Sequence, residues 1–252
     1  MPSPWEIQVA PIGGIKRVEP GDDLGRIISG ALRKVGLELE GGDIVVVTQK
    51  IVSKSEGRLV KLDEVKPTKN ALTLAAELEK DPRVVELVLR ESKRVVRKGH
   101  GVLITETKHG FVCANSGIDM SNVKSGYVTL LPLDPDASAR RLRDKLEKAT
   151  STRLAVIVTD TFGRPWREGQ IDVAIGCSGI APTQTLAGKM DPYGYVLKVT
   201  QPAVVDEVAA AAELVMKKLA LVPVAIVRGV EYKRAESGVR SLVRKRSMDL
   251  FR

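Results

Sequence analysis

Residues 154–164 read Leu-Ala-Val-Ile-Val-Thr-Asp-Thr-Phe-Gly-Arg, a strand-like apolar run followed by a carboxylate. Its apolar part, Leu154–Val158, has the length and the β-branched content of a buried strand. Asp160 follows the predicted strand almost directly. Because strands of α/β proteins end at the crevice where ligands bind, the sequence predicts a site at Asp160.

Helices and strands alternate on both sides of this stretch. Further strands are predicted at Ile44–Val47, Val102–Ile104, Phe111–Cys113 and Val224–Val227. Helices are predicted from an Asp22 cap to Val35, from Pro67 onward, from Asp81-Pro82 to near Gly99, from Asp136 to Lys148, and from Pro202 to Lys217-Lys218. The mixture predicts an α+β (mixed α/β) fold with mixed sheets and packed helices. No repeat or linker divides residues 1–252, so we expect one unit.

Composition narrows the function classes. The chain has a net charge of +9 but only 4% aromatic residues, which disfavours nucleic acid and suits small anionic substrates. Two cysteines, Cys113 and Cys177, are too few for a disulfide framework. The apolar runs are too short to span a bilayer, and Met1–Glu6 lacks the layout of a secretory signal. We therefore expect a cytoplasmic protein with no membrane partner.

Common nucleotide and zinc signatures are missing. There is no Walker A motif, no dinucleotide-binding glycine motif, and neither histidine stands in a zinc-ligand spacing. Oxygen ligands remain: Asp119, Asp160 and Thr161 follow predicted strands and suit Mg²⁺ or Mn²⁺. From spacing alone, plain turn or cap residues are the favoured interpretation of both carboxylates.

Polar residues after other strands offer groups for phosphate. Gln49, Lys50 and Lys54 follow the predicted strand Ile44–Val47, and Gly13-Gly14 follows a further strand expected near the N-terminus. Glycines let a backbone approach an anion closely. Taken singly, each feature fits an ordinary solvated face or turn better than it fits a phosphate-binding site.

Short motifs nonetheless run through the chain in a characteristic order. They are Pro11-Ile12-Gly13-Gly14, Gly42-Asp43, Ser53–Arg58, Asn115–Asn122, Leu131–Asp136, Thr159–Arg164, Ala174-Ile175-Gly176, Asp191 with Gly194, and Val227-Arg228-Gly229. This series resembles the coenzyme F420-0:L-glutamate ligase family (F420 gamma-glutamyl ligases) over nearly the whole chain. The Asn-x-Gly-Ile-Asp and Thr-Asp-Thr segments are its most specific parts.

The resemblance implies a GTP-dependent enzyme that forms an amide bond. It would join L-glutamate to the deazaflavin F420-0, with further γ-linked glutamates as an extension, through an acyl phosphate. The resemblance also implies Mn²⁺ or Mg²⁺, leaves a role for K⁺ open, and implies two interlocked lobes and a homodimer.

The resemblance assigns roles to residues one by one. Metal ligands would be Asp119, Asp160 and Thr161. Catalytic residues would be Lys54 and Asp160. Contacts to the nucleotide would come from Gly13, Gly14, Ile15, Lys16, Gln49, Lys50, Lys54 and Asn122.

One segment departs from the family pattern. The family has a glycine-rich stretch with a metal-binding Glu or Gln where this chain has Met216–Val222, without glycine. A lysine cannot replace a metal-binding carboxylate, although it can meet a phosphate. The alternatives are therefore a related ligase acting on another acid or amine, and a non-catalytic homologue that binds a nucleotide or deazaflavin.

Overall fold

The computed structural model describes residues 6–250, and a five-stranded sheet forms its centre. The strand order is β1 (Gln8–Pro11), β10 (Val224–Arg228), β2 (Ile44–Thr48), β8 (Ala155–Arg164) and β9 (Arg167–Ser178). β2 and β8 are parallel, whereas the other neighbours are antiparallel. With its packed helices, this mixed sheet confirms the predicted α+β fold.

Helices pack on the central sheet or beside it, and most of them begin at polar caps. They are α1 (Leu24–Val35), α2 (Gln49–Ser55), α3 (Lys69–Leu78), α4 (Pro82–Glu91), α5 (Pro135–Thr150) and α6 (Val204–Met216). Asp81 and Asp134 cap α4 and α5 by accepting backbone N–H groups of the first turn. The predicted Asp22 cap is wrong by one residue, because Asp23 caps α1 while Asp22 accepts the Glu19 N–H.

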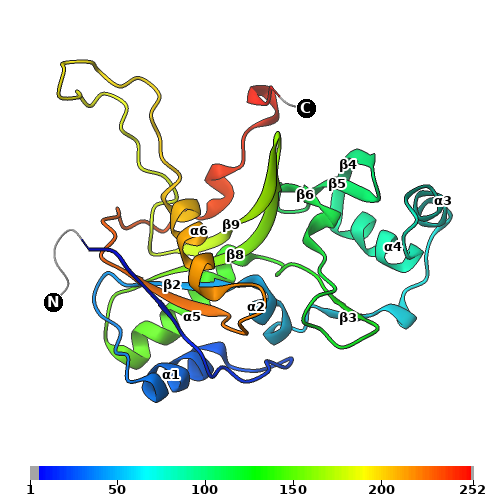
Figure 1. Cartoon of the computed structure of the whole chain (residues 1–252), viewed down its shortest axis with the longest axis horizontal. Helices are drawn as coiled ribbons and strands as arrows, with labels where there is room; N and C mark the ends of the chain where they lie inside the picture. Colours follow the sequence, from blue (N-terminus) through cyan, green and yellow to red (C-terminus); the bar gives the residue numbers. More distant parts are fainter. Residues whose placement is uncertain (1–5, 251–252) are drawn as a thin grey trace.

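The alternation of β2 shows why both faces of the sheet are covered (Figure 1). Val45 and Val47 pack into the core under α1 and α5, while Ile44 and Val46 pack into the core under α6. Successive strand residues point to opposite faces, so an unbroken apolar run is what such double covering requires.

Residues 59–130 add two small sheets and a third core beside the central sheet. One sheet pairs β3 (Leu59–Lys61) with β7 (Tyr127–Thr129), and the other has the order β4 (Ser92–Gly99), β5 (Val102–Thr107), β6 (Val112–Ala114). α3 and α4 supply most of the third core, and Figure 1 shows this region at one side of the molecule. A single catalytic unit of two interlocked lobes stays a prediction.

The predicted helix from Asp81 to near Gly99 is wrong in its second half. α4 ends at Glu91, and Ser92–Gly99 forms β4, which pairs antiparallel with β5. Val95 and Val96 are β-branched and suit a strand, but pairing with a later segment decides between the two structures. Such pairing is invisible to helical periodicity.

β8 is longer than predicted, so Asp160 lies inside the strand rather than after it. The extension is held by β9, which pairs with β8 as far as Arg164. Parallel pairing with β2, however, ends at Thr48 opposite Thr159. Asp160 is therefore the first residue of β8 that has no β2 residue beside it. The early end of β2 leaves this edge of β8 open, which is where the crevice was predicted.

An arm and short 3₁₀ turns complete the fold. Residues 179–203 leave the body between β9 and α6, as the yellow segment in Figure 1 shows. The 3₁₀ turns are Leu62–Glu64, Asn115–Gly117, Val239–Leu242 and Arg246–Met248. Within the described residues, every helix falls short of the length and apolar character that a membrane crossing demands. The prediction about a secretory signal concerned Met1–Glu6, of which Met1–Trp5 lies outside the described residues.

Candidate active site

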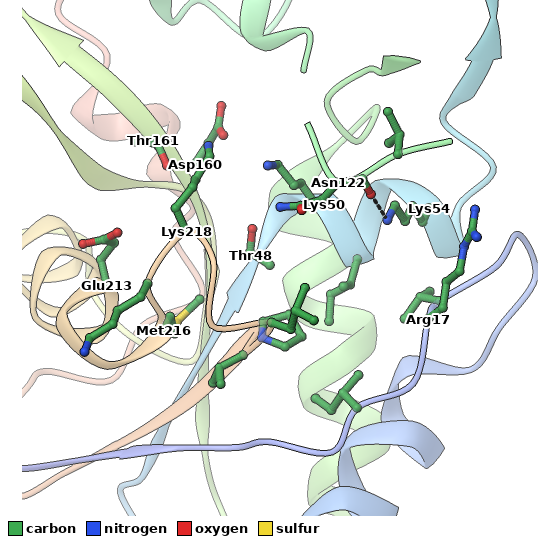
Figure 2. Close-up of a pocket in the computed structure, with 18 of the residues that line it drawn as sticks. Arg17, Thr48, Lys50, Lys54, Asn122, Asp160, Thr161, Glu213, Met216 and Lys218 are labelled. Carbon is green, nitrogen blue, oxygen red and sulfur yellow. Dashed lines mark hydrogen bonds between the residues drawn. The ribbon is translucent and has the colours of Figure 1, made fainter. Parts of the chain in front are cut away.

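A cavity of about 510 Å³ opens beyond the end of β2. Its walls come from the segment after β1, the start of α2, the β6–β7 loop, the β8–β9 hairpin and the end of α6. Figure 2 shows Asp160, Thr161 and Glu213 on one side and Arg17, Lys50 and Lys54 on the other. The cavity thus has an acidic end and a basic end.

The acidic end is built on the β8–β9 hairpin. Asp160, Thr161 and Asp172 all line it, because beyond Thr48 the open edge of β8 exposes side chains of both faces. The Thr161 hydroxyl donates to Asp172 Oδ1 at 2.7 Å, and the Thr159 hydroxyl donates to Asp172 Oδ2 at 3.1 Å.

Carboxylates gather at this end, and the positive charges of Lys218 and Lys50 offset part of their repulsion. Burial raises the pKa of Asp160 to about 7, and the charges of Asp119 and Asp172 add to the rise against the opposing Thr161 N–H. Burial, and then the charge of Asp172, also raises the pKa of Glu213 on α6. No lysine or arginine among residues 6–250 forms an ion pair with Asp160 or Asp172.

Asp119 lies between the two ends. Its Oδ2 is 2.8 Å from Lys50 Nζ and 3.8 Å from Lys218 Nζ, while Oδ1 accepts the Ser121 N–H at 2.6 Å. Burial acts to raise the pKa of Asp119, but the hydrogen bonds from Lys50 and Ser121 outweigh it, so the pKa lies below its usual value. Backbone pairing with Thr129 holds this residue in place.

The turn before Asp119 has an unusual backbone. Asn115, Ser116 and Gly117 are consecutive left-handed residues, with φ values of 51°, 53° and 70°. The Ser116 side chain holds the turn by bonding to Val88 O and Thr105 Oγ1. Non-glycine residues rarely adopt this conformation, and such strain gathers at functional sites.

Lys54 stands at the basic end, where its Nζ donates to the Asn122 carbonyl at 2.7 Å. Burial, followed by the positive charges of Arg17 and Lys50, lowers the pKa of Lys54. A cation that is partly desolvated among other cations gains from an anion. This end is therefore suited to phosphate or carboxylate groups.

The structure places most of the residues assigned by resemblance at one cavity. Ile15, Lys16, Lys50, Lys54, Asn122, Asp160 and Thr161 line it, and Asp119 contacts it through Lys50. Gly13 and Gly14 directly precede the lining, and Gly14 needs its glycine because φ is +71°. The Gln49 side chain faces away: it is fully buried, and its Oε1 accepts the Ser53 hydroxyl at 2.8 Å.

Sequence reasoning missed other lining residues, including Arg17, Asp172 and Glu213. Asp172 faces Thr161 across the hairpin, so it follows from the register once β9 is known to pair with β8. Glu213 lies near the end of α6, one helical turn before Lys217. No local signal separates either residue from an ordinary surface carboxylate.

The donor atoms fit a divalent cation that shares its coordination with a substrate. No group of three or more His, Cys, Asp or Glu within residues 6–250 suffices to hold a metal alone. Asp119, Asp160 and Thr161 supply hard oxygens, and Asp160 stands desolvated beside like charges that a cation would relieve. Mg²⁺ typically binds in this way, with one or two carboxylates, substrate phosphates and water.

Known proteins resemble this chain over nearly its whole length. A family model described as F420-0:Gamma-glutamyl ligase matches residues 14–229, which include every lining residue of the cavity. The coenzyme F420:L-glutamate ligase of Methanothermobacter thermautotrophicus is 46% identical over 249 residues, covering 98% of this chain and 99% of that protein. The proteins of the same name from Methanopyrus kandleri (45%, 98% of each chain) and Methanocaldococcus jannaschii (43%, 85% of this chain and 86% of that protein) are similar.

Proposed function

Because this chain belongs to the F420-0:gamma-glutamyl ligase family, we propose that it forms a carbon–nitrogen bond between L-glutamate and coenzyme F420-0. The observation that carries this proposal is a cavity that joins an acidic end to a basic end. Such a cavity suits a reaction whose nucleotide, acid and amino-acid substrates are all anionic.

GTP is the proposed energy source, since a carboxylate and an amine do not condense unaided in water. A carboxylate oxygen of F420-0 attacks the γ-phosphorus, and the bond to the β–γ bridging oxygen breaks, which releases GDP. The glutamate nitrogen then attacks the carbon of the acyl phosphate, phosphate leaves, and the amine proton passes to solvent. Addition of further γ-linked glutamates would repeat these steps.

The lysines of the basic end would hold the triphosphate. Lys54 and Lys50 face the cavity from α2, and Lys16 faces it from the segment after β1. Cations already in place at the transferred phosphoryl group stabilise its charge without reorganisation. Gly14, Ile15 and Asn122 lie beside them and would position the nucleotide.

Asp119, Asp160 and Thr161 would hold Mn²⁺ or Mg²⁺. When bound, such an ion neutralises charge on the phosphates. Asp119 already pairs with Lys50, which links the two ends of the cavity through one carboxylate. A role for K⁺ stays a prediction, and no residue is assigned to it.

A homodimer is part of the proposal, and the arm between β9 and α6 supports it. Its exposed apolar residues include Met190, Tyr193, Tyr195, Val196 and Val199. Tyr193 is 96% exposed and Val199 90%, which is unusual for such residues unless another surface covers them. The cytoplasmic location stays a prediction.

The segment Met216–Val222 supports an alternative, a ligase of another acid or amine. Within this segment, which lies where the family pattern is glycine-rich, Lys217 and Leu221 hold positive φ values of 49° and 56°. Both residues line the cavity, so this segment helps to shape it. Because this segment lines the cavity, the choice between GTP and ATP is left to experiment. A non-catalytic homologue that binds a nucleotide or deazaflavin is the third alternative.

The deciding assay incubates the purified protein with F420-0, L-glutamate, Mn²⁺ and either GTP or ATP, and weighs the deazaflavin by mass spectrometry. We expect a glutamyl increment that requires both triphosphate and metal, and more product with GTP. Reactions without triphosphate are the control. No increment with either nucleotide, from folded protein, would contradict the ligase and favour the alternatives.

A further inference from the structure

The β8–β9 hairpin buries a carboxylate that no proposed catalytic step uses. Asp172 lies directly opposite Thr161 in the antiparallel register and is only 6% exposed. Residues opposite each other in such a pair point to the same face, so the contact follows from the register. Both oxygens of Asp172 accept a hydroxyl, from Thr161 at 2.7 Å and from Thr159 at 3.1 Å.

These hydrogen bonds set the direction of the Thr161 hydroxyl. In both hydrogen bonds the threonine hydroxyl donates its single proton to an oxygen of Asp172. The lone pairs of Thr161 Oγ1 are then left for another partner, and Thr161 lines the cavity. Without this acceptor, the hydroxyl could rotate and present its proton to the cavity.

The surroundings argue against a purely structural role for Asp172. Within residues 6–250 no lysine or arginine forms an ion pair with it, and Asp160 and Glu213 add negative charge nearby. The positive charges of Lys50 and Lys218 act on these neighbours, but their ion pairs are with Asp119. A buried carboxylate with only neutral donors is costly. Backbone pairing already holds the hairpin, so fold stability alone does not require this charge.

We propose that Asp172 is a positioning residue that orients Thr161 Oγ1 to bind a divalent cation. This inference rests on the metal site of the proposed function. Carboxylates that accept a hydrogen bond from a metal-binding group typically change metal affinity about 10- to 100-fold when removed. Neither the motifs nor the family resemblance assigned a role to Asp172.

A double-mutant cycle tests the inference without any ligase assay. Mn²⁺ binding is followed by electron paramagnetic resonance, with and without a non-hydrolysable GTP analogue. The proteins are the wild type, Asp172→Asn, Thr161→Val and the double variant, each checked for folding by thermal unfolding. We expect each single change to weaken Mn²⁺ binding about tenfold, and the double variant to stay close to Thr161→Val.

Two further variants separate positioning from other effects. Thr159→Val removes the other hydrogen bond to the same carboxylate, and we expect its Mn²⁺ affinity to stay within about twofold of wild type. Asp172→Glu keeps the charge but displaces the acceptor, so it should weaken binding nearly as much as Asp172→Asn. It also keeps the test open if Asp172→Asn does not fold.

The possible results separate this inference from the metal site itself. Additive losses in the cycle, or full Mn²⁺ affinity in Asp172→Glu, would show that Asp172 acts by its charge or as a ligand and would overturn the positioning role. Absence of Mn²⁺ binding in the folded wild type would instead overturn the metal proposal, and the positioning role with it. Coupled losses with intact Thr159→Val would establish the role.

Discussion

The two ends of the cavity are built from different kinds of structure. The acidic end stands on β8 and β9, whose pairing continues from Val156 opposite Ser178 to Arg164 opposite Arg167. The basic end stands on loops and the short helix α2, and its Lys16, Arg17 and Lys124 are exposed. A strand ladder fixes oxygen positions as a metal requires, whereas lysines act as adaptable point charges toward phosphates.

Loss of the acidic end should have the largest effect. We expect Asp160→Ala to lower kcat/KM about a thousandfold, because charge on the transferred phosphoryl group loses its stabilisation. Steady-state kinetics and Mn²⁺ binding measure the loss, and Asp144→Ala, an exposed carboxylate on α5, is the control. Full ligase activity in Asp160→Ala would show that the catalytic charge lies elsewhere.

Loss of one cation from the basic end should cost less. We expect Lys54→Ala to lower kcat/KM for GTP about a hundredfold, and Lys54→Arg to lose less, since a positive charge remains. Lys124 lies at the same end but is exposed, and exposed charge interactions contribute about 1 kcal/mol or less. We therefore expect Lys124→Ala to change kcat/KM for GTP less than about tenfold. Equal losses in Lys54→Ala and Lys124→Ala would mean that the basic end acts only through its total charge.

Gln49 distinguishes a stabilising residue from a ligand contact at the basic end. We expect Gln49→Leu to lower the free energy of unfolding by about 1–2 kcal/mol, because the Ser53 hydroxyl loses its acceptor. The KM for GTP should change little, since the buried side chain does not reach the cavity. Thermal unfolding and kinetics of Gln49→Leu and Ser53→Ala separate the two effects. A large rise in KM with unchanged stability would restore the side chain as a nucleotide contact.

Lys218 forms a longer ion pair with Asp119 than Lys50 does, so its loss should have the smallest effect. Its Nζ lies 3.8 Å from Asp119 Oδ2, on a half-exposed side chain. We expect Lys218→Ala to tighten Mn²⁺ binding two- to fivefold without nucleotide, corresponding to an exposed ion pair of about 1 kcal/mol or less. Titration of Lys218→Arg and Lys217→Ala provides the controls, and both should keep wild-type affinity. Weaker Mn²⁺ binding in Lys218→Ala would show that the lysine supports the site instead of competing for it.

The sequence predicts local structure well where caps and periodicity act within a few residues. Asp81-Pro82 begins a helix as predicted, and the helix predicted from Asp136 begins one residue earlier, at Pro135. The apolar run Ile44–Val47 becomes a strand buried on both faces. It failed at Ser92–Gly99, where a partner strand overrides the continuation of a helix. Capping and periodicity are properties of neighbouring residues, whereas strand pairing depends on residues far along the chain.

The site divides in the same way. Motif order alone identified Lys54, Asp119, Asp160 and Thr161, and the structure brings these residues to one cavity or its edge. Gln49 shows what motif order does not predict. It is next to Lys50 in α2, but its side chain is directed into the core, where it accepts the Ser53 hydroxyl. Helical rotation and core packing decide such orientations, and a motif does not contain them.

The α+β class, the family and the polar residues proposed to carry its chemistry all follow from the sequence. The extension of β8 past Asp160, the start of its open edge where β2 ends, and the contact of Asp172 with Thr161 appear only in the folded chain. The physical reason is the register of the β8–β9 hairpin. Register depends on many cross-strand contacts at once, so it brings together side chains whose spacing in the sequence predicts no contact.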